Sequence, residues 1–492
     1  MATLGTIIVV IYVFSLSFIA IFCLMQLRLL YYYIKYGKSV GDEHLPTMDD
    51  LPLVTIQLPI FNEQLVVNRL IDNIVTLNYP KSLLQIQVID DSTDHTLEIS
   101  SKQVEKYAAL GYDITLHHRV DRTGYKAGAL KAAMPDVKGE YIAIFDADFL
   151  PDPDFLQQTI PYFVDDAVGV VQTRWGHINE EYSFLTKLQA FQLNVHFTVE
   201  QLGRYAADFL LQFNGTAGVW RKETIDTAGG WEADTLTEDL DLSYRAQMKN
   251  WKIKYLEQIE TPAELPSEIN GLKSQQYRWM KGGAETAKKL LPTVWRSDLP
   301  MRQKIHSTIH LMSSSIFVAI LMLSLSSIPL LYYINNESVN PNAFLPFMIS
   351  TTAIIAVYFT ANIRIVKREK SLGYRFFYFL FLFPAFLSIS MAMAFHNSIA
   401  VLQGYAGKVT AFIRTPKYAI VNKQDKIKKS GPGKSIKLDG KLIIELLFGL
   451  LFVGALVYSF AMGVYALLPM HLALAGGYLT LFGLGIKQQF RT

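Results

Sequence analysis

Cysteine is almost absent from this chain of 492 residues, which contains a single one, Cys23. One cysteine cannot form an intrachain disulfide, so the fold is not a disulfide-stabilised one, and a reducing compartment is the expected environment. The sequence also has no internal repeat and no long low-complexity tract. These absences favour a chain that folds around ordinary hydrophobic cores.

Charged residues are scarce as well, at 18% of the chain, against 51% hydrophobic residues. That composition is too apolar for a soluble enzyme of this length. The net charge of +3 is small, and we expect no nucleic-acid partner. The distribution of charge is more informative than its sum.

The hydrophobic residues gather in long runs. These runs cover Ile7–Met25 and, approximately, 311–334, 343–363 and 442–486, the last being long enough for two helices separated near Pro469. A bilayer core needs roughly 20 apolar residues per helix, so each run qualifies as a membrane span. The first run lacks a positively charged start and a small-residue cleavage site, so we interpret it as a retained anchor in the lipid bilayer.

Between Gly41 and about Arg302 charged residues become frequent and the apolar runs shorten, which indicates a domain outside the membrane. The predicted organisation has five parts. They are an N-terminal anchor (1–40), an α/β domain with interfacial helices (41–302), two membrane helices (303–366), an interfacial or re-entrant segment with a loop (367–441), and two membrane helices (442–492).

Lys and Arg lie on one side of the predicted spans. The connections Asn335–Asn342 and Leu467–Leu472 carry none of them. Because basic residues prefer the cytoplasmic ends of membrane helices, we expect a multi-pass plasma (inner) membrane protein whose α/β domain is cytoplasmic. The basic residues that carry this expectation are Lys35, Lys38, Arg302, Lys304, Lys367, Arg368, Lys370, Arg375 and ten more between Lys408 and Lys441.

The segment Tyr374–Gln403 is apolar enough to cross a membrane, yet both of its flanks are basic. If both flanks are cytoplasmic, the segment does not cross once. Pro384 is expected to break a helix in its first half. We therefore predict five crossings plus one segment that dips or lies flat; the alternative is a sixth crossing with the basic stretch outside.

Carboxylates collect at the ends of predicted strands. Val54–Pro59, Ile86–Ile89 and Tyr141–Phe145 read as buried strands, and Leu65–Asn78 has helical spacing. Strands that alternate with helices predict a parallel sheet with right-handed crossovers. Ligands bind such sheets at the carboxyl ends of the strands.

Asp146 and Asp148 follow one of these strands, and Asp90 and Asp91 follow another. Bare carboxylates would repel a nucleotide diphosphate, so a divalent cation is needed between them. Carboxylate oxygens suit Mg²⁺ or Mn²⁺. The alternative for Asp146 and Asp148 is an ordinary surface turn, but their position after a strand favours function.

Two further clusters are less specific on spacing alone. Asp239, in Thr237-Glu238-Asp239, is a candidate base for an acceptor hydroxyl; the alternative is a helix N-cap, since a helical pattern starts there. Gln275-Gln276-Tyr277-Arg278-Trp279 joins an amide, a cation and a large ring. Arg suits phosphate oxygens, whereas the alternative is an amphipathic helix with a half-buried Trp.

Taken together, these motifs resemble the processive glycosyltransferases of family 2, which include cellulose, chitin and hyaluronan synthases. They are most similar to the plant cellulose-synthase-like enzymes that make mannan and the xyloglucan backbone. The motifs stand in the family's order from residue 57 to residue 279. They are Gln57–Glu63, Asp90–Asp94, Gly124–Leu130, Phe145–Phe149, His196–Gln201, Phe213–Gly218, Thr237–Asp239 and Gln275–Trp279.

The resemblance implies a GT-A-like nucleotide-diphospho-sugar transferase domain, below a narrow membrane channel, with Asp239 as the base. It implies an acceptor end shaped by Phe213, Asn214, Gly215 and Thr216, with Trp279 stacking on the acceptor sugar. On the donor side it implies Glu63, Asp90 or Asp91, Lys126, Asp146, Gln275 and Arg278, with Asp148 nearest to the metal.

Phe412-Ile413-Arg414-Thr415-Pro416-Lys417 resembles the gating loop of cellulose synthases, in which a Phe-x-Val-Thr-x-Lys pattern covers the donor. Phe412, Thr415 and Lys417 match that pattern, and Arg414 stands where the family has Val. A loop that reaches the donor must be cytoplasmic, which favours five crossings. The lysines from Lys423 to Lys437 are interpreted as a solvated or lipid-facing run.

The preferred function is repeated transfer of a hexose from a nucleotide sugar to a growing β-linked polysaccharide. One rival is a single transfer to a lipid acceptor, and another is a transporter whose α/β domain only senses a nucleotide. The two plant groups use GDP-mannose and UDP-glucose, and no residue in the sequence decides between these donors. Protein partners are not predicted from the sequence.

Overall fold

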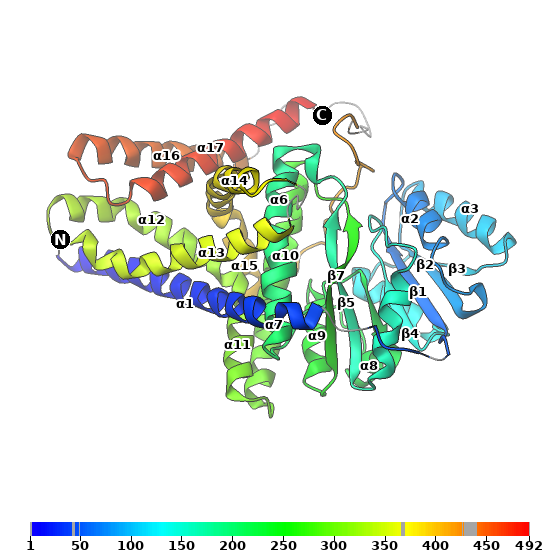
Figure 1. Ribbon diagram of the computed structural model, residues 1–492. Helices are drawn as coiled ribbons and strands as arrows, with labels where there is room; N and C mark the ends of the chain where they lie inside the picture. The colour runs from blue at the N-terminus through cyan, green and yellow to red at the C-terminus, as the bar shows by residue number, and fades with distance from the viewer. Residues whose placement is uncertain are drawn as a thin grey trace.

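The protein was analysed as a computed structural model, which describes residues 2–41, 45–48, 50–365, 370–425, 427 and 440–491. It has an α/β domain at one end and a bundle of long apolar helices at the other (Figure 1). Part of the predicted basic stretch, including Lys429, Lys434 and Lys437, lies outside the described residues, as do Lys367 and Arg368.

The α/β domain is built on a seven-stranded sheet of order β3-β2-β1-β4-β6-β5-β7. Only β6 runs antiparallel to its neighbours β4 and β5, so the predicted mostly parallel sheet is confirmed. The central strands are buried on both faces, and the polar residues that alternate along β1 and β2 hydrogen-bond across the sheet, Thr55 to Gln85 and Gln57 to Gln87. The strands are β1 (Val54–Ile60), β2 (Leu84–Asp90), β3 (Asp113–His118), β4 (Tyr141–Ile144), β5 (Val168–His177), β6 (Gly218–Arg221) and β7 (Lys252–Ala263).

Helices cover both faces of this sheet, with one hydrophobic core on each side. A π-helical turn, η5 (His196–Glu200), separates two of them. The helices of this part of the chain, of which α10 and α11 pack against other helices, are α2 (Val67–Ile74), α3 (Thr96–Ala109), α4 (Tyr125–Ala133), α5 (Phe155–Thr159), α6 (Phe184–Val195), α7 (Gln201–Ala206), α8 (Lys222–Thr227), α9 (Glu238–Gln247), α10 (Ile269–Arg296) and α11 (Met301–Leu311).

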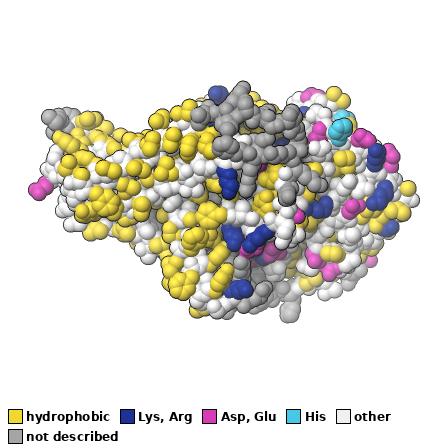
Figure 2. Space-filling view, turned by 90° about the horizontal axis from the view of Figure 1, so that it is seen from above, with side chains coloured by type: hydrophobic (Ala, Val, Ile, Leu, Met, Phe, Trp, Pro, Cys, Tyr) yellow, Lys and Arg dark blue, Asp and Glu magenta, His cyan; other side chains and the backbone are white. Residues whose placement is uncertain are grey.

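The remaining helices form the apolar part of the molecule. Six helical segments among the described residues are long and apolar enough to cross a membrane, and the chain is a multi-pass membrane protein. Figure 2 shows hydrophobic side chains over this part and charged side chains over the α/β domain. The helices are α1 (Ala2–Gly41), α12 (Ile316–Asn335), α13 (Met348–Ile365), α14 (Leu372–Ala392), α15 (Ala394–Tyr405), α16 (Gly440–Met462) and α17 (Leu468–Arg491).

The expectation that Pro384 breaks a helix was wrong. Helix α14 continues through Pro384, and the chain turns at Met393, where α14 gives way to α15. Phe379, Phe383 and Phe386 are buried around the proline, so packing holds the helical path although Pro lacks an N–H donor. In Figure 1, α14 is seen almost end-on, whereas α1, α12 and α13 run across the view.

Two close approaches fix the α/β domain against the apolar helices. A Cβ on Gly203 of α7 would lie 2.7 Å from the carbonyl oxygen of Leu29 on α1. A Cβ on Gly404 of α15 would lie 2.6 Å from the carbonyl oxygen of Lys281 on α10. Only glycine permits such backbone contacts, and they bring α1 against α7 and α15 against α10.

Candidate active site

A cavity of about 630 Å³ runs from the carboxyl ends of the strands into the space between the apolar helices. Its wall joins carboxylates of the α/β domain to apolar residues of α1, α12, α13 and α14, such as Phe22, Phe317 and Tyr358. Most of the residues predicted from the sequence line it. They are Glu63, Asp91, Lys126, Asp146, Asp148, Asn214, Gly215, Asp239, Gln275, Arg278, Trp279, Phe412, Thr415 and Lys417.

Asp90, Phe213 and Thr216 do not line this cavity and are fully buried. The Asp90 carboxylate accepts hydrogen bonds from the Ser92 backbone N–H at 2.8 Å and the Ser100 hydroxyl at 2.7 Å. The Thr216 hydroxyl accepts from the Asp146 backbone N–H at 2.9 Å. These side chains therefore brace the strand ends, and of the two aspartates after β2 it is Asp91 that faces the cavity.

Asp146 is paired with a lysine. Its carboxylate lies 2.5 Å from Nζ of Lys126, and the same ammonium donates to the carbonyl oxygen of Gly215 at 2.8 Å. Burial lowers the pKa of Lys126, but the negative charges of Asp146 and Glu238 outweigh it and raise that pKa above its ordinary value. The lysine is thus held as a cation beside the strand end.

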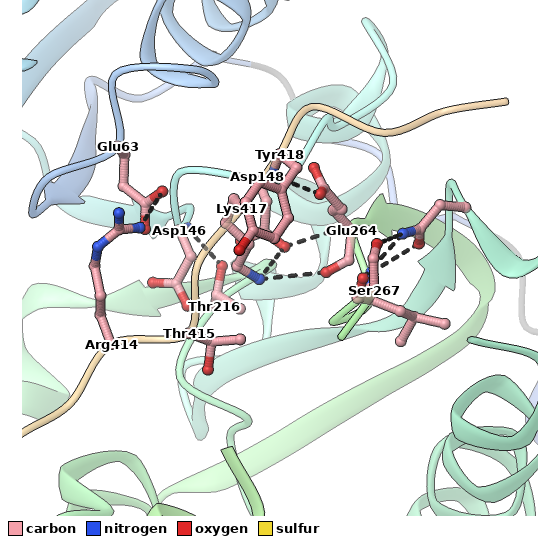
Figure 3. A network of polar contacts seen from close by, with 12 residues as sticks. Glu63, Asp146, Asp148, Thr216, Glu264, Ser267, Arg414, Thr415, Lys417 and Tyr418 are labelled. Carbon is pink, nitrogen blue, oxygen red and sulfur yellow. Dashed lines mark hydrogen bonds and ion pairs between the residues drawn. The ribbon is translucent and has the colours of Figure 1, made fainter. Parts of the chain in front are cut away.

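Asp148 is paired with a lysine from a distant part of the chain. Lys417 Nζ donates to the Asp148 carboxylate at 2.7 Å, and the Glu264 backbone N–H donates to the same oxygen at 3.1 Å (Figure 3). The Glu264 carboxylate in turn accepts from the Tyr418 backbone N–H at 2.8 Å. The segment that resembles a gating loop is therefore seated on the strand ends.

The same segment contacts Glu63 and Arg278. Arg414 lies 3.1 Å from the Glu63 carboxylate, and burial raises the pKa of Glu63 to about 8 although Arg414 and Lys417 oppose the rise. Arg278 donates to the carbonyl oxygen of Ile413 and, at 2.8 Å, to the hydroxyl of Thr415. Phe412 stacks on Tyr125, with ring centroids 5.4 Å apart.

Asp239 lies in the first turn of α9, which begins immediately after Thr237 as the helical pattern predicts. A Cβ on Gly215 would come within 3.1 Å of an Asp239 carboxylate oxygen, and Gly215 has φ of +78°. Both the close approach and this backbone conformation require glycine. Burial and the neighbouring Glu238 raise the pKa of Asp239 to about 7, which suits a carboxylate that takes up a proton near neutral pH.

Two residues that sequence reasoning missed also belong to the site. Arg119 donates from Nε to the Asp91 carboxylate at 2.9 Å, and Glu264 holds the loop. Both follow the carboxyl end of a strand, Arg119 after β3 and Glu264 after β7. The strand patterns of Asp113–His118 and Lys252–Ala263 were the signals that could have found them, because each residue directly follows one of these strands.

Asp146 and Asp148 fit a divalent cation by the chemistry of their oxygen donors, and each faces an ammonium group whose charge a metal would replace. They do not belong to a group of three acidic or His side chains. Such a group among the described residues is Glu232, Asp234 and Asp241. Lys289 contacts all three of its carboxylates, so an ammonium group already lies where a cation would bind.

Known proteins resemble this chain in its α/β domain. Residues 52–282 match the family described as Glycosyltransferase like family 2. Glucomannan 4-beta-mannosyltransferase 1 of Oryza sativa subsp. japonica is 42% identical over 261 residues, which are 52% of this chain and 50% of the relative. Glucomannan 4-beta-mannosyltransferase 7 of Arabidopsis thaliana is 40% identical over 252 residues, 50% of this chain and 45% of the relative.

The chain thus spans about half the length of the curated relatives it matches. Among solved structures, the mannosyltransferase PcManGT from Pyrobaculum calidifontis, in complex with GDP-Man and Mn²⁺, is similar with a TM-score of 0.55. The likeness covers 81% of this chain and all of that one at 19% identity, so it bears on the fold alone. Residues 52–282 thus form a domain of the family 2 glycosyltransferase type, similar at about 40% identity to plant glucomannan 4-beta-mannosyltransferases.

Proposed function

We propose that this protein is a membrane-embedded inverting β-mannosyltransferase that transfers mannose from GDP-mannose to a growing β-linked mannan chain. The observation that carries the proposal is the single cavity that begins at the strand-end carboxylates and continues between apolar helices. The relatives' names supply mannose as the sugar and glucomannan as the product. UDP-glucose, the other donor that the sequence left open, is not part of this proposal.

The donor diphosphate lies, in this proposal, among the cations that meet at the strand ends. Lys126, Arg278 and Lys417 line the cavity and offset the charge of the phosphate oxygens. A Mg²⁺ or Mn²⁺ ion held by Asp146 and Asp148 would supply further charge neutralisation as the sugar–phosphate bond breaks. Lys417 then leaves Asp148 for a phosphate oxygen.

The acceptor hydroxyl loses its proton to Asp239. This carboxylate is beside Gly215 and Asn214, the segment that the resemblance places at the acceptor end. Inversion requires the hydroxyl to attack opposite the leaving diphosphate, so the base belongs on the acceptor side of the sugar. Trp279 is half-buried in the cavity wall and offers a flat face for the acceptor ring.

Membranes that contain the full chain, incubated with labelled GDP-mannose, UDP-glucose and other nucleotide sugars, test the proposal. We expect labelled, water-insoluble polymer from GDP-mannose that a β-mannanase degrades. An organic-soluble labelled lipid would favour the glycolipid alternative, and nucleotide binding without any transfer would favour the transporter. Synthesis of polymer from UDP-glucose alone would overturn the choice of donor.

The side of the membrane on which the α/β domain lies is also a proposal. The loop that carries Lys417 and the strand end that carries Asp148 are in contact, so they share one compartment. We infer from the basic flanks of the spans that this compartment is the cytoplasm.

A further inference from the structure

The segment 232–241 leads into helix α9 and lies against helix α10 through polar contacts that the proposed transfer reaction does not use. The first half of α10 carries Gln275, Arg278 and Trp279. Residues three or four positions apart share one face of a helix, so these three side chains form a stripe along α10. The same stripe continues through positions 282, 285, 286 and 289, which contact the segment 232–241.

Lys289 makes the most contacts with this segment. Its ammonium group lies 2.5 Å from the carboxylate of Glu232, 2.8 Å from that of Asp234 and 3.0 Å from that of Asp241. Burial lowers the pKa of Lys289, but hydrogen bonds to Asp234 and Glu232 outweigh it and raise that pKa above its ordinary value. The ammonium group therefore stays charged and ties three positions of the segment to α10.

Two further contacts hold the residues that come just before the proposed base. The Glu285 carboxylate accepts a hydrogen bond from the Leu236 backbone N–H at 2.9 Å. The hydroxyl groups of Thr237 and Thr286 lie 3.0 Å apart, and a Cβ on Gly282 would lie 2.6 Å from the Thr237 side chain. The chain thus approaches α10 so closely that only glycine fits at position 282.

The Asp239 side chain is oriented within its own helix. Its carboxylate accepts a hydrogen bond from the Leu240 backbone N–H at 2.9 Å, which fixes the side chain relative to α9 but not relative to α10. Leu240 shares a hydrophobic cluster with Ala287 and Leu290 of α10. Hydrophobic packing is not directional, so the exact position of α9 on α10 depends on the polar contacts of the segment 232–241.

We infer that Lys289 and Glu285 are positioning residues for the proposed base Asp239. By holding the segment that precedes the base on α10, they fix the distance from the base to Arg278 and Trp279, which the same helix carries. Transfer needs the base, the acceptor hydroxyl and the donor sugar in alignment, and a misplacement of about 1 Å can cost about 100-fold in rate. This inference rests on the proposed function, in which Asp239 takes up the proton.

Single-turnover transfer from GDP-mannose to mannohexaose by the purified full chain tests the inference. Lys289→Met removes the ammonium group and keeps an unbranched side chain, while Arg245 still pairs with the buried Asp241. We expect transfer to be about 10- to 100-fold slower, because the base is no longer held in place. The Kd for GDP should stay unchanged, since Lys289 does not line the cavity. Lys289→Arg restores a cation and should recover most of the rate.

The Asp239→Asn background separates positioning of the base from general damage to the domain. If Lys289 acts through the base, Lys289→Met should slow the residual transfer of Asp239→Asn by less than about 2-fold, because residues that act as one unit are not additive. An equal loss of rate in both backgrounds would mean that Lys289 supports the domain as a whole, and it would overturn the inference.

Asp234→Asn keeps the test decisive if Lys289→Met does not fold. The Asp234 side chain is 57% exposed, so its charge is removed without leaving a buried group unpaired. We expect transfer to be about 3- to 10-fold slower, with no such loss in the Asp239→Asn background. Lys249→Met, at an exposed lysine just after the end of α9, is the matched control and should leave transfer unchanged.

Wild-type transfer rates in folded Lys289→Met and Asp234→Asn proteins would overturn the inference while the proposed function stands. Failure of the proposed function looks different. The wild-type protein would then transfer no mannose, or Asp239→Asn would transfer it at the wild-type rate, and either result would overturn the inference as well.

Discussion

Asp239 shows how burial sets the chemistry of a single side chain. Its pKa is raised to about 7, first by burial and then by the charge of Glu238. The proposed base acts as a carboxylate, so transfer should rise with pH through about 7 and be lost below it. Glu238→Gln removes the neighbouring charge and should move the acid limb of the kcat/KM profile to lower pH. If the acid limb of the kcat/KM profile did not shift in Glu238→Gln, the limb would not report the ionisation of Asp239, and its assignment as the base would be contradicted.

Asp239→Asn keeps the shape of the side chain but cannot take up a proton. We expect a loss of at least about 100-fold in transfer rate, the low end for general-base catalysis, with nucleotide binding near normal. Single-turnover transfer and equilibrium binding of GDP measure the two effects separately. Wild-type turnover by Asp239→Asn would show that Asp239 is not the base.

At the scale of elements, the loop and the strand ends meet through charge. Arg414 contacts Glu63, and Lys417 contacts Asp148. Arg414→Val introduces the valine that cellulose synthases have at this position of the gating loop, and it removes the ion pair with Glu63. We expect faster amide exchange over residues 412–418 in the absence of nucleotide, because the loop loses an ionic contact. Lys408→Met, at an exposed lysine that precedes the loop, is the control and should leave exchange unchanged.

The course of the helices α14 and α15 decides how many times the chain crosses the membrane. Arg375 near the start of α14 donates to the carbonyl oxygen of Ile363 on α13, and Gly404 near the end of α15 lies against α10. Helix α13 contacts α6 and η5 of the α/β domain, and α10 belongs to that domain. The pair therefore starts and ends beside that domain, and the five crossings stay a prediction, since α14 is also long and apolar enough to cross.

Cysteines at Lys370 and Lys423, in a Cys23→Ser background, test this prediction in sealed vesicles. Both positions are exposed, and we expect an impermeant thiol reagent to label them from the same side. A cysteine at Asn336, in the connection between α12 and α13, should be labelled from the opposite side. Labelling of Lys370 and Lys423 positions from different sides would mean that α14 crosses the membrane.

At the scale of the whole molecule, the proposed function joins a sugar-transfer site to the cavity between the apolar helices, and Trp279 lines that cavity. A polymerase must hold the chain end while the spent nucleotide leaves. Stacking of a sugar on an aromatic ring should contribute on the order of 1–3 kcal/mol to binding, by analogy with nucleic-acid bases that stack on aromatic side chains. Trp279→Ala should therefore shorten the bound time of the chain by about 10- to 100-fold.

The expected result for Trp279→Ala is continued donor hydrolysis with very short products in place of long polymer. Product length is measured beside GDP affinity, because a misfolded domain would lose both. Full-length polymer from a folded Trp279→Ala protein would show that Trp279 does not hold the end of the acceptor chain.

The sequence by itself determined the features that depend on neighbouring residues. Apolar runs identified the membrane helices, and carboxylates after buried strands identified the edge of the sheet where Asp146, Asp148 and Asp91 meet. Asp146 and Asp148 were found in this way, whereas the segment Phe412–Lys417 was found through its resemblance to the gating loop of cellulose synthases. These signals are local, because strand periodicity and helix hydropathy are set within one element.

Only the tertiary structure decided how these elements combine. It turned Asp91 toward the cavity and Asp90 toward Ser92 and Ser100, and it seated Lys417 on Asp148 across 269 positions of the chain. It also carried α14 through Pro384, because aromatic packing outweighed the local cost of proline. Which groups are buried, and hence which carboxylate keeps a proton, depends on contacts between distant segments that no local pattern encodes.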